Sequence, residues 1–264
     1  MPYEYHNYEH YQDPELKIIF HEDHINSKSL NQLHWHKSPE LLLITSGRLT
    51  VFCDGIERIY NPNEIAIINN NQLHDMYTNS EKCIYYCLIV DSEIYDNNNS
   101  MLSPKCESKE AVSVYKRIVA ELTNKKPNYK EAVIGYTKVL FSLISREEFA
   151  KDELSKNKRK VKLVKRATQY IYENFTEDIT LQEISDYLNT SKYYLSHIFK
   201  EITGKTIISH LNYVRCNHAK SLLKSGEYNV AESAYASGFS NLSYFSRIYK
   251  NIMGNLPVKD LKER

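Results

Sequence analysis

The sequence predicts an α+β protein of two domains, an N-terminal β-barrel with a flanking helix pair and a C-terminal all-α domain. Three observations predict this fold class. Short β-type runs separated by turns occupy residues 16–90, and helical spacing of apolar residues begins near residue 107. Two similar eleven-residue segments, identical at six positions, occur at 194–204 and 244–254. A chain of 264 residues is long enough for two domains.

The β-type region contains five runs that fit strands or strand pairs: 16–20, 40–47, 48–55, 56–68 and 82–90. Turn sequences such as Asp54-Gly55 and Asn61-Pro62-Asn63 separate them. Strands this short and this closely spaced are typical of a sandwich or a barrel.

Two helices are expected next, over about 107–148, where apolar residues recur every three or four positions. This pair has more apolar surface than a small barrel needs, so we expect it to form a homodimer contact, with packing on the barrel as the alternative that stays open. The charged segment 151–160 predicts a linker. Residues 1–150 are therefore assigned to one domain and residues 161–264 to the other.

The distribution of charge distinguishes the two domains. The whole chain has a net charge of +1, but residues 157–264 carry 17 Lys and Arg against 10 Asp and Glu, a net charge of +7. A basic domain indicates a polyanionic partner. The five cysteines form no C-x-x-C pair, which disfavours a disulfide framework or a zinc ribbon. No run of about 18 apolar residues and no signal-peptide pattern occur, so a cytoplasmic protein without a membrane partner is expected.

Each copy of the repeat completes a helix-turn-helix pattern, predicted at about 181–202 and about 229–252. A small residue, Ser185 or Ala234, lies midway along the first helix, where two helices must cross closely. Helix-turn-helix geometry also serves as scaffold, but two copies in a basic domain favour DNA binding. The helical segment between the copies is long enough to hold two reading helices in successive segments of the major groove.

The second helix of each pattern has one apolar face and one polar face. Ser191 and Asn241 are its expected N-caps in the two copies. The polar stripe carries hydrogen-bond donors and cations. A helix that lies in the major groove presents such a stripe to base edges and phosphates.

Residues 161–257 resemble the DNA-binding domain of the AraC/XylS family of bacterial transcription regulators. The family signature reads here as Ala234, Gly238-Phe239, Tyr244-Phe245-Ser246-Arg247, Tyr249-Lys250, Gly254 and Pro257. Ser185 and Ser233 depart from it, since they stand where the family usually has Ala and Ile. The resemblance implies a sequence-specific regulator, more often an activator than a repressor. It also implies promoter DNA and RNA polymerase as partners.

Carried over by position, the resemblance also implies which residues contact DNA. Those residues are Lys192, Tyr193, Ser196, His197 and Lys200 in the first copy and Asn241, Leu242, Ser243, Ser246, Arg247 and Lys250 in the second. Lys200 and Lys250 are expected at or near phosphates. Arg247 is the best candidate for reading a base, because a guanidinium can donate to both acceptors of a guanine edge. His197, mostly neutral at pH 7, is expected to be a weaker and pH-sensitive contact.

A second candidate site lies in the first domain. Its residues are His34, His36, Glu40 and His74, and Gly47 completes the pattern H-x-H-x3-E-x6-G. His34 and His36 point to the same face of a strand, where Glu40 can join them after a turn. The spacing resembles the motifs of cupin barrels and implies a cupin-like domain, although Asn63-Glu64 stands where the second cupin motif has Gly-Asp.

Three explanations stay open for this cluster. It can line a pocket for a small polar effector, with a sugar as one candidate, it can bind a divalent metal for oxygen or isomerase chemistry, or it can be structural. The family resemblance favours the effector site, because the family commonly carries a cupin-like effector domain with this pattern. We therefore expect a regulator with no enzymatic activity and no cofactor. The alternative is a metal-dependent cupin enzyme fused to a DNA-binding domain.

Overall fold

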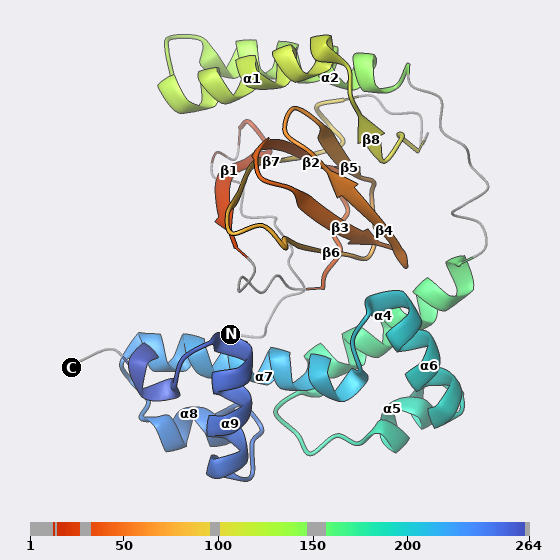
Figure 1. Ribbon diagram of the computed structural model, residues 1–264, viewed down its shortest axis with the longest axis vertical. Coiled ribbons are helices and arrows are strands. Elements are labelled where there is room, and N and C mark those ends of the chain that lie inside the picture. Colours follow the sequence, from red (N-terminus) through yellow and green to blue (C-terminus); the bar gives the residue numbers. More distant parts are fainter. Residues whose placement is uncertain (1–12, 14, 27–32, 96–100, 147–156, 262–264) are drawn as a thin grey trace. The chain divides into compact units, whose positions relative to one another are not determined.

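The structure is a computed structural model that describes residues 13, 15–26, 33–95, 101–146 and 157–261 (Figure 1). The chain forms two compact units, which meet in the sequence between Lys156 and Asn157. We call them the β-rich domain and the helical domain and describe each by itself. Among the described helices, none is long and apolar enough to cross a membrane.

The β-rich domain contains two antiparallel sheets. Its strands are β1 (Ile18–Ile25), β2 (Glu40–Ser46), β3 (Leu49–Cys53), β4 (Ile56–Tyr60), β5 (Ile65–Ile68), β6 (His74–Tyr77), β7 (Cys83–Val90) and β8 (Lys105–Cys106). The larger sheet has the strand order β1-β7-β2-β5-β8 and the smaller one β4-β3-β6. The predicted β-rich domain is confirmed, but the residues that the structure describes form two separate sheets and not one closed barrel.

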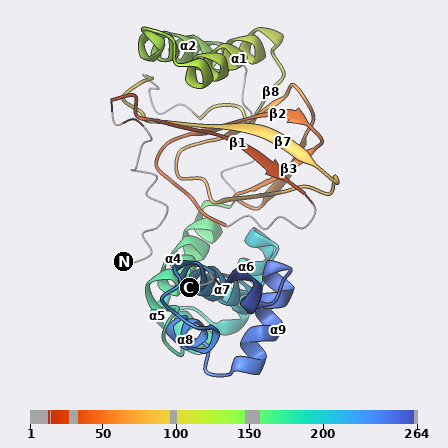
Figure 2. The ribbon, with the colours of Figure 1, turned by 90° about the vertical axis from the view of Figure 1, so that its left-hand side faces the viewer.

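Both faces of β2 are buried, which explains its continuous apolar sequence. Leu41 belongs to the core shared with α1 (Lys109–Asn124) and α2 (Tyr129–Ile144), and Leu42 belongs to the core between the two sheets. Figure 2 shows the two helices side by side over the larger sheet. Glu40 points to the same side as Leu42, because alternate residues of a strand share a face. Its carboxylate is therefore directed between the sheets.

The helix pair uses its apolar face to cover the larger sheet. Val112, Tyr115 and Ile118 of α1 and Val133 and Leu140 of α2 are buried in the same core as the sheet. The hydroxyl of Tyr115 also reaches main-chain carbonyl oxygens of β2 and β7. Packing on the sheet, one of the two explanations that the sequence left open, accounts for these residues. A homodimer contact would have to use others.

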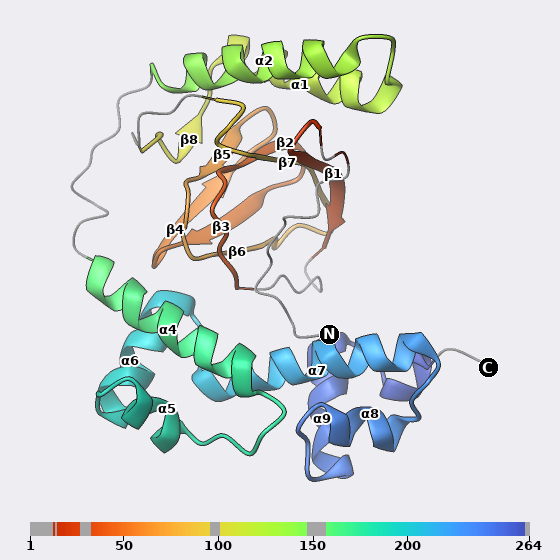
Figure 3. The ribbon, with the colours of Figure 1, turned by 180° about the vertical axis from the view of Figure 1, so that it is seen from behind.

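The helical domain consists of short helices joined by tight turns. They are α4 (Lys158–Asn174), α5 (Leu181–Tyr187), α6 (Lys192–Thr203), α7 (Ile207–Ser225), α8 (Val230–Ala236), α9 (Leu242–Met253) and the 3-10 helix η1 (Pro257–Asp260). Figure 3 shows α7 running from the α4–α6 group to the α8–α9 group. The predicted linker is corrected at its end, because residues 158–160 form the first turn of α4; residues 151–156 lie outside the described residues.

The two helix-turn-helix units begin in the same way. A capping box opens α5, where Thr180 and Glu183 satisfy each other's backbone N–H groups, and Asn229 and Glu232 do the same for α8. Each of these side chains therefore supplies an acceptor to a helix N-terminus that would otherwise leave its first N–H groups unpaired. Each capping box joins two residues three positions apart, and it fixes the residue at which its helix starts.

The turns inside the two units also correspond. Each contains one residue in the left-handed region, Asn189 with φ 52° and Gly238 with φ 82°. The next backbone N–H donates to the carbonyl oxygen of the small residue, Ser185 or Ala234, at 2.9 and 3.0 Å. Both small residues are fully buried, as expected where two helices cross closely. The repeat in the sequence is therefore a repeat of structure.

Ser233→Ala is expected to raise the free energy of unfolding by about 1 kcal/mol. Ser233 is fully buried, and among the described residues its hydroxyl oxygen has no hydrogen-bond partner. Ser185→Ala is the control, because the Ser185 hydroxyl donates to the carbonyl oxygen of Gln182 at 2.8 Å and its loss should not stabilise the protein. Urea unfolding followed by circular dichroism compares the two. A Ser233→Ala protein less stable than its parent would contradict the prediction.

Candidate functional sites

The predicted contact residues of α6 and α9 form the same pattern on an exposed face of each helix. On α6 the exposed side chains are Lys192, Tyr193, His197 and Lys200, with Ser196 half-buried. On α9 the exposed side chains are Leu242, Ser243, Arg247 and Lys250, with Ser246 half-buried. The opposite face of each helix is buried through Leu195 and Phe199 or through Phe245 and Tyr249. Each helix therefore brings its predicted contact residues together.

Asn241 has a structural role in addition to its predicted contact. Its side-chain oxygen accepts a hydrogen bond from the backbone N–H of Tyr244 at 2.8 Å, and Ser191 caps α6 through Tyr194 in the same way. Both N-caps are as the sequence predicts. The cap uses only the side-chain oxygen, so the amide N–H groups of Asn241 can still donate to a ligand.

The two helices differ in charge at one corresponding position. Arg247 of α9 takes the place that His197 has on α6. The Arg247 guanidinium lies 5.6 Å from the centre of the Tyr244 ring, and Nε2 of His197 lies 3.9 Å from the carboxylate of Glu201. A guanidinium presents five N–H donors in a planar fork, whereas an imidazole presents two ring nitrogens. The face of α9 therefore carries a guanidinium at this position and that of α6 an imidazole.

The 19 residues of α7 separate the two units by about 28 Å of helix. Arg215, buried on this helix, holds it to the segment between α4 and α5: its Nε donates to the carbonyl oxygen of Phe175 at 2.7 Å and its Nη2 to that of Glu177 at 2.6 Å. The sequence analysis missed Arg215. The signal was an arginine among the apolar positions of a predicted helix, but its partners lie about forty residues away.

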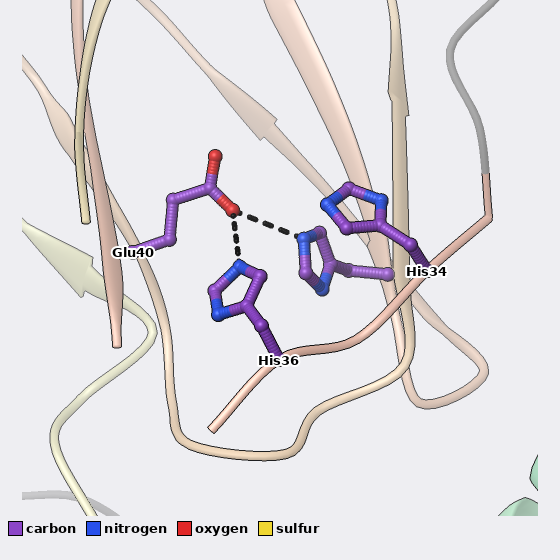
Figure 4. Close-up of side chains that lie close together, drawn as sticks. His34, His36 and Glu40 are labelled. Atoms are coloured by element: carbon purple, nitrogen blue, oxygen red, sulfur yellow. Dashed lines mark hydrogen bonds and ion pairs between the residues drawn. The ribbon is translucent and has the colours of Figure 1, made fainter. Parts of the chain in front are cut away.

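The four predicted residues of the β-rich domain do come together. One ligand-type atom each of His34, His36, Glu40 and His74 lies within 4.8 Å of the others. Nε2 of His36 and Nε2 of His74 lie 3.1 and 3.0 Å from the same oxygen, Oε2 of Glu40 (Figure 4). His34 is half-buried and the other three are buried. Because Glu40 belongs to the larger sheet and His74 to the smaller one, the cluster joins the two sheets.

Cys87 is a further member of this cluster. Its thiol donates to the second oxygen of the Glu40 carboxylate, with Sγ and Oε1 3.1 Å apart. Burial raises the pKa of the Cys87 thiol well above its usual value, so the thiol keeps the proton that it donates. The sequence analysis missed Cys87, because only the pairing of β2 with β7, in which Cys87 lies opposite Leu42, brings it to Glu40.

Main-chain contacts fix the hydrogens on two of the histidines. Nδ1 of His36 lies 2.6 Å from the carbonyl oxygen of Ser38, and Nδ1 of His74 lies 2.8 Å from that of Gln72. A carbonyl oxygen only accepts, so both Nδ1 atoms carry a hydrogen. The Nε2 atom of each ring is then the one that faces Glu40.

The charges of the cluster support each other. Burial acts to raise the pKa of Glu40, but the hydrogen bonds and charges of His36 and His74 outweigh it and hold this pKa well below the usual value. Burial acts to lower the pKa of His74, and the contact with Glu40 outweighs that effect and raises it. The contact between Glu40 and His74 therefore favours the charged form of both groups, as in a buried ion pair.

The donor set also fits a divalent metal. Imidazole nitrogens and a carboxylate are ligands for such ions, and metal-binding histidines usually donate their other N–H to a carbonyl oxygen, as His36 and His74 do. Nε2 of His74 is fully buried and lies 3.0 Å from Oε2 of Glu40, so the atom that would ligate a metal faces this carboxylate. The residues that would hold a metal are His34, His36, Glu40 and His74.

Two protein families match this chain. The AraC-like ligand binding domain matches residues 15–107, and a helix-turn-helix domain matches residues 184–263. The first range includes all of β1 to β8 and the histidine cluster, and the second includes most of α5 and all of α6 to α9.

Similar proteins are transcription regulators. The bifunctional transcriptional activator and DNA repair enzyme AdaA of Bacillus subtilis is 33% identical over 92 residues, which are 35% of this chain and 44% of AdaA. The Msm operon regulatory protein of Streptococcus mutans is 31% identical over 127 residues, which are 48% of this chain and 45% of that protein. The chain thus spans less than half the length of each of these curated relatives.

A solved structure is similar in fold over most of the chain. A crystal structure of an apo ToxT variant from Vibrio cholerae matches 92% of this chain and 96% of its own chain with a TM-score of 0.50. The sequence identity is 15%, so this match bears on the fold alone. It agrees with a β-rich domain followed by a helical domain.

Proposed function

Because the chain belongs to the AraC family of transcription regulators, we propose that it binds specific sites in double-stranded promoter DNA through both helix-turn-helix units. One observation carries the proposal: α6 and α9 expose the same stripe of polar and cationic side chains on a domain of net charge +7. Two reading helices joined by a spacer of about 28 Å suit successive major-groove segments, which lie about 34 Å apart.

In this proposal the exposed residues divide between bases and phosphates. Bases are contacted by Tyr193, Ser196 and His197 of α6 and by Leu242, Ser243, Ser246 and Arg247 of α9. The remaining contacts, at or near phosphates, are Lys192, Lys200, Asn241 and Lys250. Phosphate contacts set register and affinity, and base contacts set sequence preference.

The proposal extends to partners and location. A regulator at a promoter acts through RNA polymerase, and activation is the favoured mode because a similar protein, AdaA, is named an activator. We propose a homodimer, since symmetric pairs are the commonest assemblies of soluble proteins. A protein that acts on promoter DNA in a bacterium works in the cytoplasm.

Arg247→Ala is expected to weaken binding to the specific site by about tenfold or more and to relax the preference at one base pair, since a bidentate contact to guanine is lost. Lys250→Ala should weaken specific and non-specific binding alike and reduce the salt slope by about one. Fluorescence anisotropy with duplexes at several salt concentrations measures both effects. Full affinity and an unchanged base preference in both variants would mean that α9 does not read DNA.

We further propose that the β-rich domain binds a small polar effector, with a sugar as the first candidate, at the cluster around His34. The support is the match to the AraC-like ligand binding domain and the half-buried His34 beside three buried polar residues. Binding would shift the population of arrangements that the DNA-binding units adopt.

A thermal-shift screen of the full chain against sugars, small acids and divalent metals tests this part. A ligand of the native state raises the melting temperature by mass action. The shift should disappear in His34→Ala. A screen in which every compound leaves the melting temperature unchanged, or a shift that His34→Ala retains, would argue against an effector at this cluster.

A divalent metal is the second candidate ligand, favoured by the convergence of three imidazoles and one carboxylate within 4.8 Å. If metal alone shifts the melting temperature, two further measurements separate its roles. A change in DNA affinity on metal addition would indicate a metal-responsive regulator. Turnover in oxygen-dependent or isomerase assays would indicate the alternative, a metal-dependent cupin enzyme fused to a DNA-binding domain.

A further inference from the structure

We propose that Asn212 and Tyr244 position Arg247 for reading a base, so that the specificity of the second helix-turn-helix unit depends on a buried side chain of α7. Asn212 and Tyr244 are positioning residues in this proposal, and Arg247 is the residue that touches the base. The inference rests on the proposed function of α9 and adds a determinant that lies off the reading helix.

The first step is the contact between α7 and α9. Asn212 is 6% exposed, and its Nδ2 donates to the hydroxyl oxygen of Tyr244 at 2.8 Å. The Tyr244 side chain is 36% exposed and also lies beside Phe239, with 6.2 Å between ring centres. The hydroxyl end of the ring is therefore tethered to the domain while part of the ring stays accessible.

The second step is the contact between Tyr244 and Arg247, one helical turn apart on α9. The guanidinium carbon of Arg247 lies 5.6 Å from the centre of the ring. A guanidinium is attracted to the face of an aromatic ring, and a tethered ring gives it one preferred position. A long side chain that is ordered before it binds loses less conformational entropy at the interface. The tether should therefore increase both affinity and selectivity at the base that Arg247 reads.

The first unit provides a matched comparison. Tyr194 takes the place of Tyr244 there, and His197 takes the place of Arg247. Within the described residues the Tyr194 hydroxyl has no hydrogen-bond partner. The His197 ring lies nearly parallel to that of Tyr193, at 7° and with 6.5 Å between ring centres. Removing the Tyr194 hydroxyl thus makes the same chemical change without breaking a tether.

The test uses the full chain and a duplex that the chain itself selects from a randomised library. Tyr244→Phe removes only the hydroxyl, Asn212→Leu replaces the amide, and with it the donor, by an apolar group of similar size, and Tyr194→Phe is the control. Both test variants should bind the selected duplex about threefold to tenfold more weakly. They should also lose discrimination at the base pair that Arg247→Ala relaxes, with an unchanged salt slope. In an Arg247→Ala background the same changes should have no further effect.

The outcomes separate this inference from the proposed function. If Arg247→Ala changes the preference at no base pair, the reading role of α9 fails and the inference fails with it. If Arg247→Ala relaxes one base pair while Tyr244→Phe and Asn212→Leu keep full discrimination there, only the positioning role is wrong. An equal loss from Tyr244→Phe with and without Arg247 would also overturn it, because the tether would then act on stability alone.

Discussion

Gly238→Ala is expected to destabilise the helical domain by about 3 kcal/mol, the largest effect of any exchange considered for this domain. Gly238 has φ 82° in the turn between α8 and α9, where a side chain is strained. A Cβ there would lie 2.5 Å from the carbonyl oxygen of Phe175 and 2.9 Å from Nε of Arg215. It would thus force apart the hydrogen bond that holds α7 to the segment between α4 and α5.

Gly254→Ala is the matched control for this prediction. Gly254 ends α9 with φ 78°, and a Cβ there would meet no atom within 4 Å. It should therefore cost only the backbone strain, about 1 kcal/mol. Circular dichroism during urea unfolding follows mainly the helices, and the fluorescence of the single tryptophan, Trp35, follows the β-rich domain separately. Equal destabilisation by both exchanges would show that the close contact at Gly238 has no cost.

Acidification is expected to destabilise the helical domain by about 2 kcal/mol between about pH 7.5 and about pH 5, through His210. His210 is fully buried in α7, with its ring 5.7 and 5.8 Å from those of Phe199 and Tyr172. Burial, with a smaller effect of the charge of Lys205, lowers the pKa of His210 to about 3. The folded state keeps this ring neutral, and the unfolded state takes up a proton below about pH 6.5. Stability is therefore lost as the pH falls from about 6.5 towards 3.

His210→Leu should remove most of this pH dependence, because leucine fills the space and does not titrate. The urea midpoint of the helical transition, measured at several pH values, compares the two proteins. His218, whose pKa burial also lowers, should leave a smaller slope of the same sign. An unchanged slope in His210→Leu would mean that the buried ring is not the group that takes up the proton.

The helical domain follows from the sequence because its signals are local. Ser191 and Asn241 cap the reading helices from within one turn, and Gly204 and Gly254 end them in the left-handed conformation. The exposed stripe is then a consequence of helical periodicity. Each of these features depends on residues a few positions apart, and each can therefore be predicted from a local sequence pattern.

The contacts that the sequence did not predict join distant segments. Arg215 donates hydrogen bonds to carbonyl oxygens about forty residues away, and Asn212 of α7 donates one to Tyr244 of α9. Cys87 meets Glu40 only through strand pairing. Likewise, the apolar stripe of the helix pair predicted that these side chains are buried. It did not predict that the larger sheet is the surface that buries them. Whether strands close into a barrel or form two sheets also depends on pairings between distant strands, which periodicity does not specify.

The central claim is that α6 and α9 each read one segment of the same DNA site. Selection of duplexes from a randomised library by the full chain, by His197→Ala and by Arg247→Ala tests it most directly. The account predicts two clusters of preferred base pairs, about one helical turn or about 10 base pairs apart, with each exchange relaxing a different cluster. A selection without any preferred sequence, or two variants that relax the same cluster, would contradict it.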